Sequence, residues 1–368
     1  MLKVAVEATA LIGQRTGVGE YTQHLLEELP RAGVEVSAFP ISLRRREALR
    51  GLLPQGVAPL ELPLAARPLR WGWAHLGRPY LDIFFGGFDV IHGTNFVVPP
   101  AKRVGTVVTV HDLTPVLYPE YCEPAVLDYP VLIRRALDAG TYVITPSSFV
   151  RAQVVELFGA DPERVIAVLE GPAVPSAQPE PVKPSWAGGR FLASLSTLEP
   201  RKGVLDLLLA FERVALEIGD LQLVIAGRRG WGMEEFDRAL SKSPVRDRVI
   251  LPGYVTEQER RWLLEHAEAF VLASHYEGFG LPVLEAMAYR CPVICTTAGA
   301  LPEVAGEAAA LVEPRDPDGL ASAILKVLGD SAESAAMVAR GVQQIAGFSW
   351  TEMARQTAAV YARAALWR

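Results

Sequence analysis

The feature that most constrains the fold is a regular alternation of short apolar, β-branched runs with helix-like segments. One series of runs covers 3–8, 35–40, 89–93, 105–112, 142–147 and 164–171, and a second covers 190–197, 221–227, 249–255, 269–274, 291–296 and 309–314. Runs that are apolar along nearly their whole length predict parallel strands buried on both faces, with helices between them. The expected class is α/β with doubly wound sheets.

A proline-rich stretch separates the two series of strands. Residues 171–189, GPAVPSAQPEPVKPSWAGG, have a composition that favours an extended linker. A chain of 368 residues also exceeds the size of one ordinary core. We therefore expect an N-terminal Rossmann-like domain over 1–172, a linker over 173–188, a C-terminal Rossmann-like domain over 189–347, and an amphipathic helix over 348–368 that can cross back to the N-terminal domain.

Charge and cysteine content exclude several classes of protein. The net charge of −6 argues against a general nucleic-acid binder. MLKVAVEATALIG begins at once with a strand pattern, so we expect no signal peptide, and no apolar run is long enough to span a bilayer. The three cysteines lack zinc spacing, and Cys291 and Cys295 are expected to be buried. These features predict a cytoplasmic protein.

Two carboxylates bracket a glycine-containing loop after the run at 269–274. In HYEGFGLPVLEA, Glu277 precedes the loop and Glu285 lies inside a helix expected over Leu281–Tyr289. Ligands of doubly wound sheets bind at the carboxyl ends of strands, and a helix N-terminus attracts phosphate. Taken singly, Glu285 would be a first-turn helix stabiliser and Glu277 a solvated loop charge. Together they predict carboxylates that accept hydrogen bonds from sugar hydroxyls.

A basic pair follows the first strand of the second series. Arg201 and Lys202 stand between that strand, 190–197, and a helix expected over Leu205–Ile218. An Arg–Lys pair in a turn is most often an ordinary basic surface. Here it shares the carboxyl edge of one sheet with the two glutamates, and a guanidinium fork beside an ammonium suits a diphosphate. The combination predicts a nucleotide-sugar site.

These motifs resemble those of the retaining glycosyltransferases of family four, which have the GT-B fold with two domains facing a central cleft. LEPRKG and the stretch from PGYVT to CPVI carry the likeness, which extends over nearly the whole chain. The resemblance implies that Arg201 and Lys202 bind the donor diphosphate, Glu285 the ribose and Glu277 the transferred sugar. Further donor contacts implied by it are Val255 beside the base and Gly278, Phe279, Gly280 and Leu281 beside the sugar.

The N-terminal half matches the mannosyltransferase-like branch of that family in DVIHGTNFVVPP and VVTVHDLTPVLYPEY. The resemblance implies that His111, followed by Asp112, faces the reacting sugar. TGVGEYTQHLLEELP resembles the family's glycine-rich loop, and its spacing is not the G-x-G-x-x-G fingerprint of dinucleotide binding. The acceptor and phosphate residues implied in this half are Gly17, Val18, Gly19, Tyr21 and Asn95. His75 and His266 have no such context and are expected to be structural.

The resemblance also implies the reaction. It implies transfer with retention by front-face attack, from a nucleoside-diphosphate hexose, with mannose and GDP favoured and UDP next, to a saccharide or lipid-linked acceptor. No Asp-x-Asp motif ends a strand, so we expect metal independence and no cofactor. Another GT-B enzyme, such as a nucleotide-sugar epimerase or a phosphorylase, and a non-catalytic nucleotide-sugar-binding module are the alternatives.

One segment of the N-terminal half is strongly basic. Residues 43–80 carry seven arginines, including Arg44, Arg45 and Arg46, with Trp71 and Trp73 near the end. Such a segment can rest on an anionic membrane, where a lipid-linked acceptor would lie. A solvated helix and loop with both tryptophans in the core explains the pattern equally well.

Overall fold

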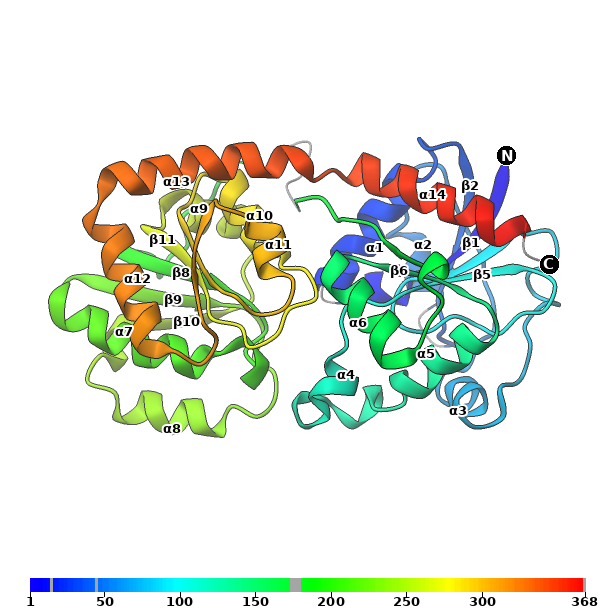
Figure 1. The fold of residues 1–368 in the computed structure, drawn as a ribbon, viewed down its shortest axis with the longest axis horizontal. Helices are drawn as coiled ribbons and strands as arrows, with labels where there is room; N and C mark the ends of the chain where they lie inside the picture. The colour runs from blue at the N-terminus through cyan, green and yellow to red at the C-terminus, as the bar shows by residue number, and fades with distance from the viewer. Residues whose placement is uncertain (14–15, 44–45, 173–179, 367–368) are drawn as a thin grey trace. The chain divides into compact units, whose positions relative to one another are not determined.

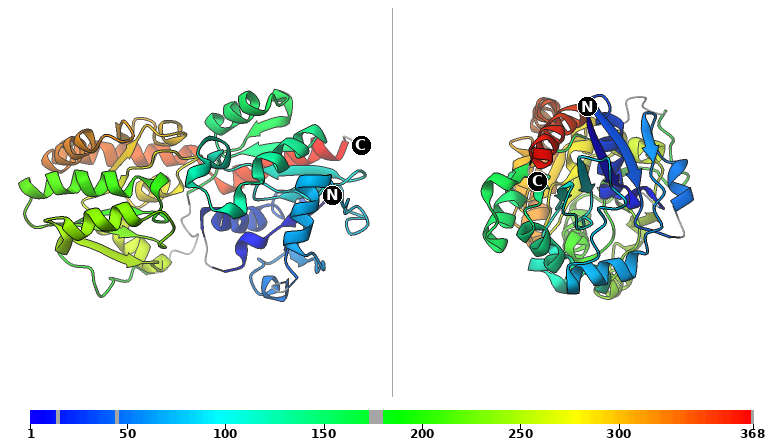
Figure 2. Two further views of the ribbon diagram at one scale, coloured as in Figure 1. Left: turned by 90° about the horizontal axis from the view of Figure 1, so that it is seen from below. Right: turned by 90° about the vertical axis from the view of Figure 1, so that its right-hand side faces the viewer.

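The computed structural model describes residues 1–13, 16–43, 46–172 and 180–366, and it divides into two compact units (Figure 1). The first unit comprises Met1–Glu170 and Ser349–Arg368, and the second comprises Gly171–Phe348. Each unit contains one parallel sheet with helices against both of its faces (Figure 2). The α/β class and the pair of Rossmann-like domains of the GT-B fold are therefore confirmed.

The first sheet has the strand order β3-β2-β1-β4-β5-β6-β7, and neighbouring strands are parallel throughout. Its strands are β1 (Leu2–Glu7), β2 (Val34–Phe39), β3 (Val57–Pro59), β4 (Val90–Gly93), β5 (Gly105–Thr109), β6 (Tyr142–Thr145) and β7 (Val165–Ala167). The order reverses direction between β1 and β4. Ligands of doubly wound sheets bind at such a switch point.

The helices of the first unit are α1 (Gly17–Glu28), α2 (Arg46–Arg50), α3 (Ala66–Leu76), α4 (Thr114–Leu117), α5 (Tyr129–Asp138), α6 (Ser148–Phe158) and α14 (Trp350–Leu366). Helix α1 begins at Gly17, four residues before Tyr21, where the large buried side chains of this helix start. Gly17, Val18 and Gly19 therefore form the first helical turn. The expectation of a glycine-rich loop at these residues was wrong.

The C-terminal helix α14 packs on the first unit, against β5 and α1 (Figure 1). The Ser349 hydroxyl accepts a hydrogen bond from the backbone of Glu352 at 3.3 Å, as expected for a cap. Thr351 donates to Glu28 of α1 at 2.9 Å, and Tyr361 is fully buried in the core of this unit. The last helix thus belongs to the hydrophobic core formed by the start of the chain.

The second sheet has the order β10-β9-β8-β11-β12-β13 and reverses between β8 and β11. Its strands are β8 (Arg190–Leu195), β9 (Leu221–Ala226), β10 (Val249–Gly253), β11 (Ala269–Leu272), β12 (Val293–Thr296) and β13 (Ala309–Val312). Its helices are α7 (Val204–Glu217), α8 (Glu234–Lys242), α9 (Glu257–His266), α10 (Leu281–Ala288), α11 (Leu301–Ala305), α12 (Pro317–Gly329) and α13 (Ser331–Gln344). Cys291 and Cys295 are buried here, as expected.

The proline-rich stretch is described only in part. Residues 173–179 lie outside the described residues. The part that follows belongs to the second unit, where the Val182 amide donates to the Gln258 carbonyl at 3.2 Å and the Lys183 ammonium lies over the Trp262 ring. These contacts tie the stretch after residue 180 to α9.

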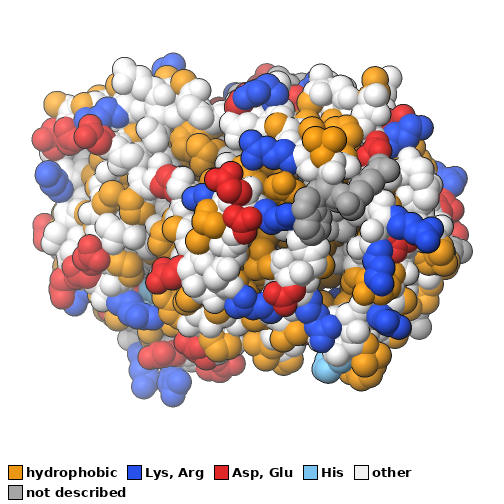
Figure 3. All heavy atoms as spheres, turned by 45° about the vertical axis from the view of Figure 1, so that its right-hand side comes forward, with side chains coloured by type: hydrophobic (Ala, Val, Ile, Leu, Met, Phe, Trp, Pro, Cys, Tyr) orange, Lys and Arg blue, Asp and Glu red, His pale blue; other side chains and the backbone are white. Residues whose placement is uncertain are grey.

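The basic segment 43–80 fits neither expectation completely. Trp73 is buried and donates to the Pro79 carbonyl at 3.0 Å, whereas Trp71 is 57% exposed, so only one tryptophan is in the core. Arg50 and Arg70 form ion pairs with acidic residues. Arg44 and Arg45 lie outside the described residues. In the described ranges no helix is long and apolar enough to cross a membrane, and charges of both signs are interspersed on the face in Figure 3.

Candidate functional site

The switch point of the second sheet is shaped by a tight turn after β8. Pro200–Lys202 form a short 3-10 turn, and Gly203 then takes a left-handed conformation with φ 61° before α7 begins. A Cβ atom at Gly203 would overlap the carbonyl oxygen of Ala273, which follows β11. Only glycine lets the turn approach the end of β11 this closely. The neighbouring strands β8 and β11 therefore bring Arg201 and Lys202 to the segment that carries Glu277.

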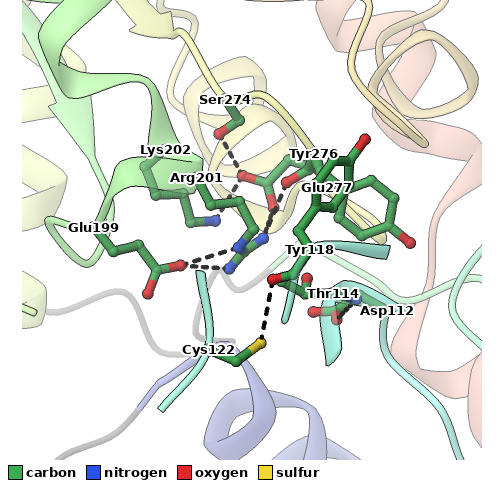
Figure 4. A network of polar contacts seen from close by, with 10 residues as sticks. All are labelled: Asp112, Thr114, Tyr118, Cys122, Glu199, Arg201, Lys202, Ser274, Tyr276 and Glu277. Atoms are coloured by element: carbon green, nitrogen blue, oxygen red, sulfur yellow. Dashed lines mark hydrogen bonds and ion pairs between the residues drawn. The ribbon is translucent and has the colours of Figure 1, made fainter. Parts of the chain in front are cut away.

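Glu277 is the centre of a buried polar cluster (Figure 4). Its Oε1 accepts hydrogen bonds from Lys202 Nζ and Ser274 Oγ, each at 2.6 Å, and its Oε2 lies 3.5 Å from Arg201 Nη1. Arg201 also donates to the Tyr276 carbonyl at 3.0 Å and to the Glu199 carboxylate at 2.7 and 3.0 Å. Glu277 is thus not a solvated loop charge, and the basic pair is not an ordinary surface turn.

The charges around Glu277 determine its protonation. Burial alone would raise the pKa of Glu277, but the charges of Lys202 and Arg201 and the hydrogen bonds from Lys202 and Ser274 outweigh it. The pKa of Glu277 therefore lies below its usual value of 4.5. The site holds a carboxylate beside two cations, an arrangement ready to exchange one anion for another.

The loop after Glu277 is closely packed. Gly278, Phe279, Gly280 and Leu281 are all buried. Gly280 has φ 114° at the N-terminal cap of α10, and Pro282 occupies the first turn as expected. The first N–H groups of a helix have no acceptor within it, so the N-terminus of α10 is suited to a polar ligand.

Glu285 lies one turn further along α10 than expected. Because the helix begins at Leu281, Glu285 is in its second turn, and the explanation of it as a first-turn helix stabiliser was wrong. Its side chain is 5% exposed, and its carboxylate lies 3.3 Å from the guanidinium of Arg260 on α9. Val255 is buried in the loop between β10 and α9, at the carboxyl edge of the same sheet. Nothing in the sequence pattern pointed to Arg260.

The carboxyl edge of the first sheet places His111 directly after β5. Its Nε2 donates to the Thr94 carbonyl at 2.8 Å, and its Nδ1 lies 3.6 Å from the carboxylate of Glu170. The Tyr21 ring meets the His111 ring edge to face, with 4.9 Å between centroids. His111 is therefore held on three sides by its own unit.

The other residues expected at this edge have different surroundings. The Asp112 carboxylate accepts a hydrogen bond from the amide of Thr114, two residues further along the chain, at 2.8 Å (Figure 4). Asn95 is half-buried after β4, in a short backbone bridge with Val97. Gly17 is exposed and Gly19 is buried in the first turn of α1.

A buried chain of hydrogen bonds, which the sequence did not predict, reaches His111 through the ring of Tyr21. Tyr21 Oη lies 2.9 Å from Thr109 Oγ1, which lies 2.8 Å from His92 Nε2, and His92 Nδ1 lies 2.7 Å from Tyr361 Oη on α14. Burial, with the nearby charge of His111, lowers the pKa of His92 to about 3, and burial raises the pKa values of both tyrosines. The chain is therefore neutral at pH 7.

Glu7 and Glu170 are two further carboxyl groups that the sequence reasoning missed. Both are buried; Glu7 is the last residue of β1, and Glu170 follows β7. The sequence does hint at them, because each is an acidic residue near the end of an apolar run. His111 has the same position in its own run. Burial raises the pKa of Glu7.

His75 and His266 have the structural surroundings expected of them. Each bonds through Nδ1 to the backbone carbonyl four residues earlier in its helix and stacks on a tryptophan. In the described part of the chain, no group of three or more His, Cys, Asp or Glu side chains is placed to hold a metal ion.

Comparison with known proteins identifies the relatives of both halves. The family described as "Glycosyl transferases group 1" matches residues 180–344, and "Glycosyltransferase Family 4" matches 15–171. O-antigen chain mannosyltransferase B of Escherichia coli is 31% identical over 305 residues, which cover 80% of this chain and 77% of that protein.

Two other proteins extend the comparison. MMP α-(1→4)-mannosyltransferase of Mycolicibacterium hassiacum is 33% identical over 227 residues, covering 60% of this chain and 54% of that protein. Among solved structures, HepE of Anabaena in complex with UDP and glucose matches with a TM-score of 0.72 and 17% identity, over 99% of this chain and 100% of that one. The last likeness shows the fold.

Proposed function

The chain belongs to the group 1 glycosyl transferases, and from this premise we propose that it moves a hexose, mannose by preference, from a nucleoside-diphosphate sugar to a saccharide or lipid-linked acceptor. The observation that carries the proposal is the buried cluster of Arg201, Lys202 and Glu277 at the switch point of the second sheet. Two cations held beside one carboxylate suit a ligand that combines a diphosphate with sugar hydroxyls.

The cluster suggests how the donor binds. In the unliganded site, Glu277 serves as the counter-ion of Lys202 and Arg201. An incoming diphosphate takes over these cations through charge-assisted hydrogen bonds, and the carboxylate then accepts hydrogen bonds from the sugar. Glu285, held by Arg260, accepts those of the ribose. Lys202 and Arg201 therefore keep a negatively charged partner in both states, Glu277 before the donor binds and the diphosphate afterwards.

The same groups would act in the reaction. As the bond between the anomeric carbon and the phosphate breaks, negative charge grows on the diphosphate. Arg201, Lys202 and the N-terminus of α10 are fixed in advance to stabilise that charge, which lowers the barrier. The departing phosphate accepts the proton of the acceptor hydroxyl, which attacks from the same face, so the anomeric configuration is retained. No metal is needed, because the two side-chain cations supply the positive charge.

The relatives support mannose and leave the nucleotide to experiment. Two of them are named as mannosyltransferases, which favours mannose and hence GDP, while HepE was solved with UDP. His111, fixed by Thr94 and Glu170, would face the reacting sugar from the first unit. We place the protein in the cytoplasm, at the inner face of the membrane where the acceptor is lipid-linked.

A ligand screen tests the proposal. GDP-, UDP- and ADP-sugars are titrated into the full chain by calorimetry, and the tightest donor is then offered saccharide and lipid-linked acceptors, with and without excess EDTA. We expect one donor to bind and to yield product with retained configuration in EDTA. Donor conversion without an acceptor would indicate an epimerase, and binding without turnover a non-catalytic module. Loss of activity in EDTA, restored by Mg²⁺ or Mn²⁺, would contradict metal independence.

A further inference from the structure

His275 lies between β11 and Glu277 and holds the basic turn from two directions. Its backbone N–H donates to the carbonyl of Arg201 at 2.7 Å. Its ring Nε2 lies 2.6 Å from the carboxylate of Asp206, in the first turn of α7. One residue therefore binds both the turn that carries Arg201 and Lys202 and the helix that follows this turn.

The direction of the side-chain bond is fixed by chemistry. The carboxylate of Asp206 only accepts, so the Nε2 of His275 must donate, and the bond is charge-assisted. Both side chains are largely buried, with 14% of His275 and 18% of Asp206 exposed. Gly203 packs against the His275 ring: a Cβ there would be 3.3 Å from the ring, besides overlapping the Ala273 carbonyl. The ring thus closes one side of the turn.

The remaining nitrogen of this ring has no role in packing. His275 Nδ1 is buried and has no hydrogen-bond partner among the described residues. A buried polar atom without a partner costs stability, so folding alone favours an apolar side chain at this position. What the histidine supplies is a rigid donor that reaches Asp206.

The position of the turn determines where the charges of Lys202 and Arg201 lie. Lys202 and Arg201 reach Glu277 only while the turn keeps its present position against the end of β11. A guanidinium fork recognises phosphate well only when it is held in place in advance. Removal of Asp206 also removes a negative charge from the neighbourhood of the diphosphate. If binding is nevertheless lost, the loss reflects position and not charge.

We propose that His275 and Asp206 are positioning residues of the donor site, which clamp the turn 200–203 so that Arg201 and Lys202 present their charges to the diphosphate. The assignment rests on the proposed function, and it adds two residues that the sequence motifs do not include. Because the clamp acts on the phosphate-binding turn, it should affect the diphosphate and leave recognition of the nucleoside unchanged.

The test is calorimetric titration of the full chain with GDP, UDP and ADP, followed by the free nucleoside of the tightest one. Asp206→Ala and His275→Ala should each weaken diphosphate binding by about 10- to 100-fold and leave nucleoside binding unchanged. Asp206→Asn keeps an oxygen that can accept from Nε2, and it should restore binding to within about threefold. Glu217→Ala, at the other end of α7, is the matched control and should change neither affinity.

Each other outcome has a distinct meaning. Unchanged diphosphate affinity in Asp206→Ala and His275→Ala would overturn the clamp and leave the proposed function standing. Equal losses for nucleoside and diphosphate would show a purely structural role and also overturn it. If the unaltered protein bound none of the three diphosphates, the proposed function would fall, and this assignment with it. Should His275→Ala fail to fold, the Asp206 pair of variants decides.

Discussion

The carboxyl edges of the two sheets are built from different chemistry. At the second edge, Glu277 lies against Lys202 and Arg201, so buried charges hold the site together. At the first edge, His111 rests on a chain of neutral groups that ends at Tyr361. Burial keeps His92 uncharged in that chain, whereas the cations keep Glu277 charged. The same architecture therefore provides one edge held together by buried charges and one edge supported by a neutral chain of hydrogen bonds.

The difference follows from what each site would handle under the proposed function. A diphosphate leaving group gains charge, so its site needs fixed cations whose mutual repulsion is relieved by a counter-ion until the ligand arrives. An acceptor hydroxyl is neutral, and its site needs only correct positions. Hydrogen bonds among neutral groups supply these positions without the cost of burying charge. The comparison predicts that the two edges respond differently to mutation, pH and salt.

The largest effect is expected from Glu277→Ala. It leaves the Lys202 and Arg201 charges in a buried site without their shared carboxylate, and removal of one partner of a buried ion pair costs about 3–5 kcal/mol. Urea unfolding should show this loss. Because a diphosphate can replace the missing carboxylate, GDP or UDP should restore more stability to the variant than to the unaltered protein.

The double variant Glu277→Ala/Lys202→Ala is the control for that comparison. If the charges hold this edge, the double variant should lose less stability than the sum of the two single variants. Additive losses, or a loss below about 1 kcal/mol in Glu277→Ala, would contradict a site held together by charge.

The second effect concerns pH and the first edge. The pKa of His92 is about 3 in the folded chain and 6.5 for an ordinary histidine. The unfolded chain therefore binds a proton below pH 6.5 that the folded chain refuses. His92 should cost stability progressively as pH falls from 6.5 toward 3, by up to about 1.4 kcal/mol per pH unit. Glu7 acts oppositely, because its raised pKa lets the folded chain take up a proton above pH 4.5.

Comparison of His92→Gln with the unaltered protein isolates the histidine, since the contribution of Glu7 cancels. Glutamine can still bond to Thr109 and Tyr361 and does not titrate, so the free energy of unfolding should fall less steeply between pH 6.5 and 4. His266→Gln, an exposed histidine of the second unit, is the matched control and should keep the original slope. Identical slopes in all three proteins would show that burial of His92 does not govern acid stability.

The contrast also explains what the sequence could predict. The strand alternation predicted the strands that the structure describes in both sheets except the short edge strand β3, because apolar runs are local in the chain. The residues proposed to bind the donor could be located as well, since Arg201–Lys202 and Glu277–Glu285 lie in short segments that follow neighbouring strands.

The hydrogen-bond chain at the first edge could not be predicted in the same way. His92 meets Tyr361 across most of the length of the chain, and only the packing of α14 on the first sheet brings them together. Arg260 joins Glu285 from another helix for the same reason. Glu170 follows an apolar run as His111 does, so a search for polar residues at strand ends could have located it. The helix pattern starts at Tyr21 because Gly17 and Gly19, in the first turn of α1, have no side chains that would extend it.

The third prediction separates the roles of the charged residues in ligand binding. Arg201→Ala and Lys202→Ala each remove a charge-assisted contact and should weaken binding of the nucleoside diphosphate by about 1.5–3 kcal/mol, roughly 10- to 150-fold. Glu285→Ala should weaken it too, because its proposed partner is the ribose. Glu277→Ala should bind the free diphosphate at least as tightly as the unaltered protein, because the ligand no longer has to displace a carboxylate, and should impair use of the intact sugar donor.

Calorimetry with the free diphosphate and with the intact donor decides among these roles. Unchanged diphosphate affinity in both the Arg201 and the Lys202 variant would remove the basic pair from the site. Equal losses in Glu277→Ala and Glu285→Ala would contradict the division between sugar and ribose.

The smallest effect concerns exposed arginines. It tests whether those of the first unit, and not those of the second, attract the protein to membranes. On α3, Arg67 and Trp71 lie one turn apart and are exposed, and Arg78 is exposed in the loop that follows. An arginine near an anionic surface contributes about 1 kcal/mol, and the attraction is screened over about 8 Å at physiological ionic strength.

The protein should therefore sediment with anionic vesicles, poorly with neutral ones, and less as salt is added. Arg67→Glu/Arg78→Glu should reduce this binding and leave donor affinity unchanged, whereas Arg246→Glu, an exposed arginine of the second unit, should change neither. If Arg246→Glu released the protein as effectively, or if neutral vesicles bound equally well, the segment 43–80 would be a solvated surface, and a soluble acceptor would be as well supported as a lipid-linked one.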